Sequence, residues 1–181
     1  MNIFISGGCK NGKSDFAQEI ALKLAGSGKR YYVATMIPYD SEDRARVAKH
    51  ITGRAGMGFE TLELGRDISS CLEYTDKNAV YLVDSVTALL LNELFPKEHG
   101  GSADPDGVQR CRDGLLALAA NVRDAVFVSD YIYSDAERYD EFTENYRRSL
   151  AAVDRALAEI CDTVVELCAG NIILYKGELP K

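Results

Sequence analysis

Short apolar runs alternate along the chain with longer stretches of helical spacing. Several of the runs are apolar almost throughout, which is typical of strands covered on both faces of a sheet. The predicted strands are residues 2–6, 30–35, 79–84, 125–130, 163–167 and 171–175. The predicted helices are residues 14–26, 41–54, 85–95, 106–122 and 138–160. This alternation predicts an α/β fold with a mostly parallel sheet and helices on both of its faces.

The last two predicted strands depart from the alternation. Residues 163–167 and 171–175 are separated only by Cys168, Ala169 and Gly170. Such a short connection predicts a hairpin, and therefore an antiparallel strand at the edge of the sheet. In open sheets of this kind, ligands bind at the carboxyl ends of the parallel strands.

The first predicted strand leads into the glycine-rich loop GGCKNGKS, whose spacing is that of G-x-x-x-x-G-K-[ST]. The motif lies between a strand and a helix, as a phosphate-binding P-loop requires, although a chance glycine-rich turn is the alternative. Its backbone N–H groups and the following helix would attract an anion, Lys13 would reach the β- and γ-phosphates, and Ser14 would ligate Mg²⁺. The predicted nucleotide-binding residues in this loop are Gly7, Gly8, Cys9, Lys10, Asn11, Gly12, Lys13 and Ser14.

Two predicted strands end in an aspartate. Asp84 follows Val80–Val83 and is the preferred candidate for the carboxylate that holds magnesium in a P-loop enzyme. Asp130, which follows Val126–Ser129, is the rival. Either aspartate could instead be a helix N-cap or a turn residue at a strand end.

Histidine is scarce in this sequence, which has only His50 and His99. His99 falls in a glycine- and proline-bearing stretch that is typical of a mobile loop. Arg46, His50 and Arg54 are spaced at i, i+4 and i+8, so on a helix they would share one face. Cationic neighbours disfavour a further positive charge, which would leave a neutral, nucleophilic imidazole beside two guanidinium groups that could clamp a triphosphate. The alternative is a solvated basic helix face.

Composition limits the remaining possibilities. The 181 residues carry no linker-like stretch and no repeat, which predicts a single P-loop nucleotide-binding domain over residues 1–181. With 21 Lys and Arg against 28 Asp and Glu, the net charge of −7 gives no basic face for nucleic acid, so small molecules are the expected partners. Five cysteines without C-x-x-C spacing indicate neither a zinc site nor a disulfide framework. The absence of a long apolar run predicts no signal peptide and no membrane span, and together these features favour a cytoplasmic protein.

An ordered set of segments resembles the bifunctional adenosylcobinamide kinase and adenosylcobinamide-phosphate guanylyltransferase family of cobalamin synthesis. The segments that carry the resemblance are GGCKNGKS, YVAT at 32–35, R-V-A-K-H-x-x-x-R at 46–54 with FETLE after it, LVDSVTALLLNEL at 82–94, VFVSD at 126–130, YRRSLAAVDRALA at 146–158 and AGNIILYKG at 169–177. They cover nearly the whole chain in the family's order.

This resemblance implies two activities in one enzyme. The P-loop would bind GTP or ATP, with Mg²⁺ as cofactor, and a phosphoryl group would pass to the corrinoid. His50 would then accept GMP from GTP as a phosphoramidate, which the phosphorylated cobinamide attacks. The family often assembles as a trimer, so a homo-oligomer is expected here.

Two segments depart from the family's pattern. The family usually continues Ser-Asn-Glu-Val-Gly after its fifth strand, whereas Ser129 is followed here by Asp130, Tyr131, Ile132, Tyr133 and Ser134. Where F-R-D-x-x-G-x-x-N-Q is common, this chain has residues 146–155, with Asp154 and Arg155 at the last two positions. A kinase of another small alcohol and a nucleotide-binding module without turnover are therefore the alternative functions.

Overall fold

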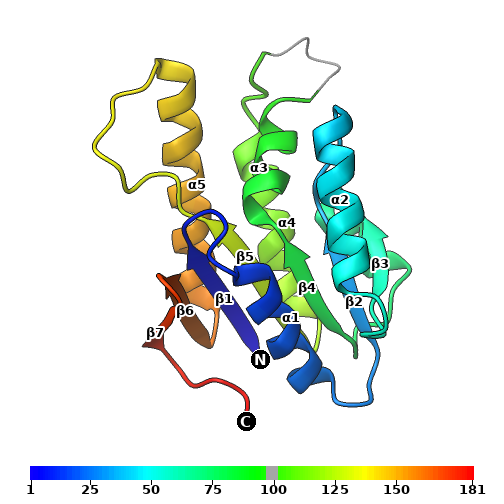
Figure 1. The fold of residues 1–181 in the computed structure, drawn as a ribbon. Coiled ribbons are helices and arrows are strands. Elements are labelled where there is room, and N and C mark those ends of the chain that lie inside the picture. The colour runs from blue at the N-terminus through cyan, green and yellow to red at the C-terminus, as the bar shows by residue number, and fades with distance from the viewer. Residues whose placement is uncertain (97–101) are drawn as a thin grey trace.

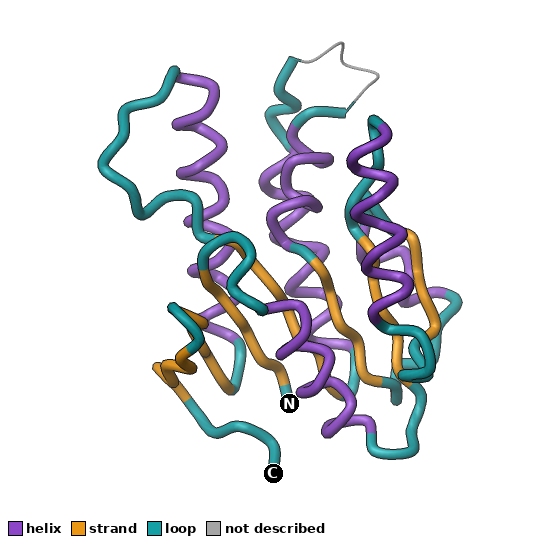
Figure 2. Tube along the Cα trace, viewed as in Figure 1, coloured by secondary structure: helices purple, strands orange, loops and turns teal. Residues whose placement is uncertain are grey.

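The computed structural model describes residues 1–96 and 102–181 (Figures 1 and 2). Its centre is a sheet with the strand order β3-β2-β4-β5-β1-β6-β7. All neighbouring strands are parallel except the β6–β7 pair, which is antiparallel. The strands are β1 (Asn2–Gly7), β2 (Arg30–Ala34), β3 (Glu60–Glu63), β4 (Val80–Asp84), β5 (Asp124–Asp130), β6 (Thr163–Cys168) and β7 (Asn171–Lys176).

Helices cover both faces of this sheet. The helices are α1 (Lys13–Ala25), α2 (Ser41–Gly53), α3 (Val86–Leu94), α4 (Gly107–Asn121) and α5 (Glu141–Ile160), with a 3₁₀ helix η1 (Ile68–Glu73). Helix α1 packs on one face, whereas α3, α4, α5 and η1 supply the core of the other. Helix α2 contributes no buried residue and stands beside the sheet without entering either core.

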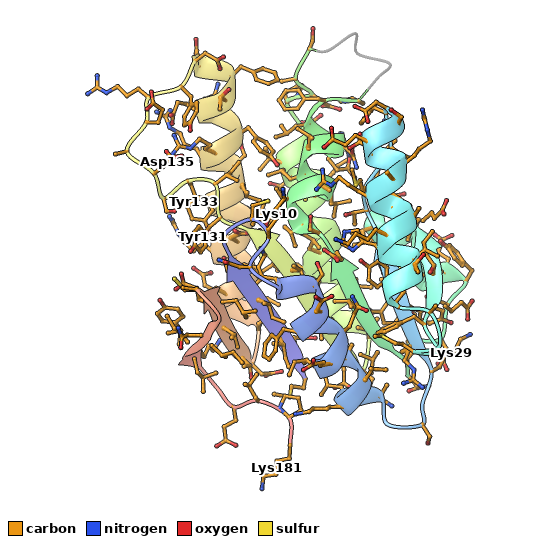
Figure 3. All side chains as sticks on the ribbon, in the orientation of Figure 1. Lys10, Lys29, Tyr131, Tyr133, Asp135 and Lys181 are labelled. Carbon is orange, nitrogen blue, oxygen red and sulfur yellow. The ribbon has the colours of Figure 1, made fainter. Side chains whose placement is uncertain are left out.

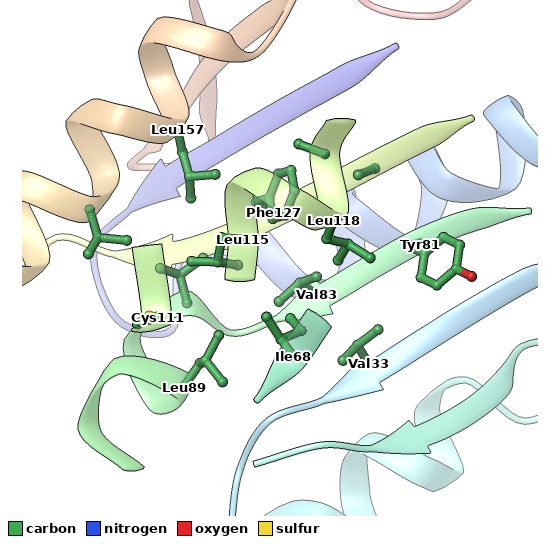
Figure 4. Packing of buried hydrophobic residues seen from close by; sticks show 14 of the residues in the cluster. Val33, Ile68, Tyr81, Val83, Leu89, Cys111, Leu115, Leu118, Phe127 and Leu157 are labelled. Carbon is green, nitrogen blue, oxygen red and sulfur yellow. The ribbon is translucent and has the colours of Figure 1, made fainter. Parts of the chain in front are cut away.

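Alternate residues of each central strand supply the two cores. Ile3 and Ile5 of β1 point toward α1, and Phe4 between them points to the opposite face. On that opposite face, Phe127 of β5 meets Leu115 of α4 (Figure 4). Burial of apolar side chains on both faces explains why these strands are nearly continuous apolar runs.

The sequence-based fold class is confirmed, including the mostly parallel sheet and the antiparallel hairpin at its edge. Strand β3 and the 3₁₀ helix η1 were not predicted. Strand β3 has the sequence ETLE and lies at the sheet edge with mostly exposed side chains, so it carries no buried apolar run to reveal it. The prediction for His99 lies outside the described residues. Within the described ranges, none of the helices combines the length and the apolar character needed to cross a bilayer.

Candidate functional site

The P-loop connects β1 to α1 at the carboxyl edge of the sheet. Gly12 precedes the helix with φ +79°, a left-handed conformation that glycine adopts without strain. At Gly7 a side chain would collide with the Leu167 carbonyl of the neighbouring strand and approach the Lys13 side chain. Backbone conformation at Gly12 and lack of space at Gly7 therefore explain why these two positions are glycine. The loop also lies between a strand and a helix, as a phosphate site requires.

The Lys13 side chain folds back over this loop. Its ammonium group donates to the Gly8 carbonyl at 2.7 Å and pairs with Asp130 Oδ1 at 2.6 Å. The Lys13 side chain is only 6% exposed, whereas that of Asp130 is 31% exposed. The carboxylate of Asp130 is therefore the anionic partner of the lysine that P-loops use to bind phosphate.

Asp84 and Asp130 lie at the same edge on neighbouring strands. Asp130 pairs in register with Gly7, and Asp84 pairs with Val128, so Asp130 extends two residues farther along β5. The Asp84 carboxylate accepts a 2.6 Å hydrogen bond from the Tyr32 hydroxyl. Burial, together with the Asp84 charge, raises the pKa of Tyr32, which keeps the hydroxyl protonated and donating. Asp130 is held through its backbone N–H, which donates to Thr87 Oγ1 at 2.9 Å.

Oxygen ligands for a hard cation are present at this edge. Ser14 supplies a half-buried hydroxyl, and Asp84 and Asp130 supply carboxylates. Among the residues that the structure describes, no cluster of three or more His, Cys, Asp or Glu side chains forms a cage for a metal. Magnesium commonly binds through one or two carboxylates plus phosphate and water, so this donor set fits Mg²⁺ bound together with a nucleotide.

Helix α2 carries the predicted His50. His50 is exposed, and β4 lies between the P-loop and α2 in the view of Figure 1. Arg46 is also exposed, and its Nη1 lies 3.9 Å from Asp43 Oδ1. Arg54 is only 7% exposed and lies just past the helix, where its backbone N–H donates to the His50 carbonyl.

The Arg54 guanidinium is engaged within the protein. It lies 4.1 Å from the centre of the Tyr32 ring and donates to Thr61 Oγ1 at 3.0 Å. These contacts attach the end of α2 to β2 and β3. The role of Arg54 as a triphosphate clamp stays a prediction.

The segment after β5, one of the two departures from the family's pattern, is fixed by Arg147 of α5. The buried Arg147 side chain donates to the Ile132 carbonyl at 2.9 Å, to Asp135 Oδ1 at 2.7 Å and to Glu144 Oε1 at 2.6 Å. Tyr131 and Tyr133 lie along this segment, near the P-loop residue Lys10 in the view of Figure 3. The Tyr131 N–H donates to the Gly7 carbonyl at 3.3 Å, so the segment is joined directly to the P-loop.

Asp154 is a buried carboxyl behind this segment. Its Oδ2 accepts hydrogen bonds from Ser129 Oγ at 3.0 Å and from the Tyr133 hydroxyl at 2.9 Å. Burial raises the pKa of Asp154 to about 7, the two hydrogen bonds oppose that rise, and the Asp130 charge adds to it. A pKa near 7 means that Asp154 changes charge near neutral pH. Its partner Ser129 directly precedes Asp130, the residue that pairs with Lys13.

Stability is expected to fall with rising pH because of Asp154. The unfolded carboxyl loses its proton near pH 3.8 and the folded one near pH 7, so unfolding releases a proton between these values. The contribution of Asp154 to the free energy of unfolding should therefore drop by roughly 4 kcal/mol across this window and then level off. Asp154→Asn keeps an acceptor for Ser129 and Tyr133 but cannot ionise. Urea unfolding of the wild type and of Asp154→Asn between pH 4 and 8 measures how far their free energies of unfolding diverge. Parallel curves of this free energy against pH would contradict a raised pKa at Asp154.

Sequence reasoning identified no role for several residues of this site. The hydroxyls of Tyr32 and Tyr133 each donate to a carboxylate that lies far away in the sequence, and Thr87 Oγ1 accepts from the backbone N–H of Asp130. Their only sequence signal is a hydroxyl close to the end of an apolar strand or the start of the next element. Asp154 was noted as a departure from the family's pattern, but its contact with Ser129 depends on the packing of α5 against the sheet.

Solved structures similar to this chain are P-loop proteins at low sequence identity. The flagellar accessory protein FlaH from Methanocaldococcus jannaschii matches with a TM-score of 0.51 and 13% identity, over 98% of this chain and 78% of its own. A solved ATPase domain matches with a TM-score of 0.56 and 10% identity, over 97% and 76%. The RadB recombinase matches with a TM-score of 0.50 and 18% identity, over 99% and 82%. At these identities the matches establish the P-loop NTPase-like fold alone.

A family model gives a more specific result. A search of curated proteins found no match to this chain. The model described as "Cobinamide kinase / cobinamide phosphate guanyltransferase", however, matches residues 3–174, which is nearly the whole chain and includes the P-loop, both strand-end aspartates and His50. The chain therefore belongs to the cobinamide kinase / cobinamide phosphate guanyltransferase family.

Proposed function

We propose that this protein phosphorylates adenosylcobinamide with a nucleoside triphosphate and then transfers GMP from GTP to the product through a guanylyl-histidine on His50. The observation that carries the proposal is the P-loop of a member of this family, with Lys13 facing a strand-end carboxylate at the ligand edge of the sheet. The exposed imidazole of His50 on α2 supports the second half of the reaction.

In the kinase step the protein positions the nucleotide and the corrinoid and neutralises the charge of the phosphates. The P-loop N–H groups hold the phosphates, and Lys13 exchanges Asp130 for a phosphate oxygen of the nucleotide. Ser14 and Asp84 would hold Mg²⁺, with Asp130 as the other candidate ligand. The ion would screen the charge that develops on the transferred phosphoryl group. A hydroxyl of the corrinoid side chain attacks the γ-phosphorus, and the nucleoside diphosphate leaves.

In the transfer step His50 is the nucleophile. One imidazole nitrogen attacks the α-phosphorus of GTP, a P–N bond forms, and the bond to pyrophosphate breaks. A phosphate oxygen of the phosphorylated corrinoid then attacks the same phosphorus and releases His50. Since α2 has no buried residue and stands apart from the P-loop, we infer that this helix shifts toward the nucleotide, with Arg46 on the phosphates.

The magnesium ligand can be tested by matched substitutions. We expect Asp84→Asn to raise the Mg²⁺ concentration needed for half-maximal turnover by about 10-fold or more, since one hydrogen bond or charge to a cation is typically worth 1–3 kcal/mol. Asp130→Asn should raise this Mg²⁺ concentration less, because the substitution would mainly remove the ion pair with Lys13. Initial rates at varied Mg²⁺ and saturating nucleotide measure both, and the reverse ranking would move the ligand role to Asp130.

The proposed reactions are tested directly by incubation of the protein with adenosylcobinamide, GTP and Mg²⁺. Chromatography should show adenosylcobinamide phosphate first and the GDP-linked corrinoid afterwards. Consumption of nucleotide with a different alcohol, but not with cobinamide, would favour the other-kinase function. Tight GTP binding without any product would favour a nucleotide-binding module.

A further inference from the structure

A cavity of about 580 Å³ lies on the face of the sheet opposite α1. It is open to solvent and is lined by residues of α5, of β1, β6 and β7, and of the segment that follows β5. Its wall combines apolar side chains from the sheet and α5 with hydroxyl and carboxyl groups. The lining includes Phe4, Tyr131, Ala151, Asp154, Val164 and Glu166. None of the P-loop residues 7–14 belongs to its lining, so this cavity is separate from the expected phosphate site.

Asp154 is the most unusual group in this wall. The residue is only 3% exposed, and both of its recorded hydrogen bonds arrive at Oδ2. Its Oδ1 is buried and has no hydrogen-bond partner among the residues that the structure describes. A buried acceptor without a donor is destabilising, and more so when it is charged. Because Asp154 lines the cavity, a ligand whose N–H or O–H donor reaches Oδ1 would satisfy this oxygen.

A second carboxylate faces the cavity from β6. Glu166 Oε2 accepts a 2.6 Å hydrogen bond from the Tyr175 hydroxyl of β7. A hydrogen bond with Glu166 is also the main reason that the pKa of Tyr131 is raised. Tyr131, Tyr133 and Tyr175 all line the space. The lining also includes one cationic residue, Arg155, which is exposed on α5.

These groups select one class of ligand. Two carboxyl groups disfavour an anion, and a purely apolar molecule would leave Asp154 Oδ1 without a donor. Phe4, Ala151 and Val164 provide apolar contact, and tyrosine rings attract a cation over their faces. We propose that the cavity binds a small organic ammonium ion, with its N–H groups donating to Asp154 and its apolar body against Phe4 and Val164.

This site is connected to the nucleotide loop through two adjacent residues of β5. Ser129 donates to Asp154, and Asp130 pairs with Lys13. Tyr131, which lines the cavity, donates its backbone N–H to Gly7. An ammonium ion in the cavity thus contacts the same segment that holds the P-loop lysine. The proposal concerns binding alone and does not rest on the proposed reactions.

The test uses phenethylammonium as the probe and 2-phenylethanol as its neutral analogue. Each is titrated into ¹⁵N-labelled full-length protein in phosphate buffer, because Tris is itself a primary amine. We expect saturable shifts of the backbone amides of residues 129–133 and 151–158 with the ammonium ion. Affinity for the alcohol should be at least about 10-fold lower, as a hydrogen bond to a charged group is worth roughly 1.5–3 kcal/mol. Equal affinity for both, or no saturable shift, would overturn the proposal.

Three variants locate the site. Asp154→Asn should weaken binding of phenethylammonium by about 10-fold or more, as for other buried charge-assisted hydrogen bonds. Ala151→Leu should obstruct the cavity without changing any charge, and it decides the question if Asp154→Asn does not fold. Glu159→Gln removes an exposed carboxylate of α5 outside the cavity and is the matched control. Wild-type affinity in either of the first two variants, or equal loss in the control, would contradict the assignment.

Discussion

Lys13→Ala is expected to reduce kcat/KM for both reactions by about 10²–10³-fold or more, which is the usual cost of removing one group that stabilises transition-state charge. Lys13 is the buried cation of the P-loop, and it bonds to the Gly8 carbonyl and to Asp130. Nucleotide titration and initial rates measure the loss, and circular dichroism checks that the fold is retained.

The matched control for this substitution is Lys23→Ala. Lys23 is an exposed lysine in the last turn of the same helix, far along α1 from the P-loop. It should leave nucleotide affinity and turnover unchanged. Retention of full GTP and ATP affinity in Lys13→Ala would remove the P-loop assignment, because no other described feature of the loop supplies a buried cation.

His50→Ala is expected to separate the two activities. Guanylyl transfer should fall by at least about 10³-fold, as is common when a covalent nucleophile is removed. Phosphorylation of cobinamide should persist, because it requires only the P-loop, the metal ligands and a positioned hydroxyl. Separate assays of the phosphorylated and GDP-linked products measure the split.

The control for His50→Ala is Lys49→Ala, which removes a neighbouring exposed side chain of α2. The control should transfer GMP at a rate close to that of the wild type. Equal loss of both activities in His50→Ala would indicate that α2 is needed for the structure of the site rather than for a covalent step.

Most of the fold could be predicted because its strands and its P-loop are each recognisable from a short stretch of sequence. Strands β1, β4 and β5 are buried on both faces and therefore appear as apolar runs, and the P-loop motif places the ligand edge at residues 7–14. Strand β3 could not be found in the same way, since its ETLE sequence lies exposed at an edge. Homo-oligomer formation and a cytoplasmic location stay predictions.

The candidate site was less predictable because its contacts join residues that are distant in sequence. The strand-end positions of Asp84 and Asp130 followed from the pattern, but the pairing of Lys13 with Asp130 depends on β1 and β5 being neighbours. Helical spacing placed Arg54 on the face of His50, yet its side chain stacks on Tyr32. Spacing along one helix gives no information about which strand lies beneath its end.

The central claim is the covalent guanylyl-histidine, and it is tested most directly by incubation of the wild-type protein with α-labelled GTP and Mg²⁺. The account predicts label on the protein that is stable in base and lost in acid, as a phosphoramidate is, and that maps by mass spectrometry to the peptide containing His50. Label that survives acid, label on another residue, or protein that makes the GDP-linked corrinoid without ever carrying label would contradict it.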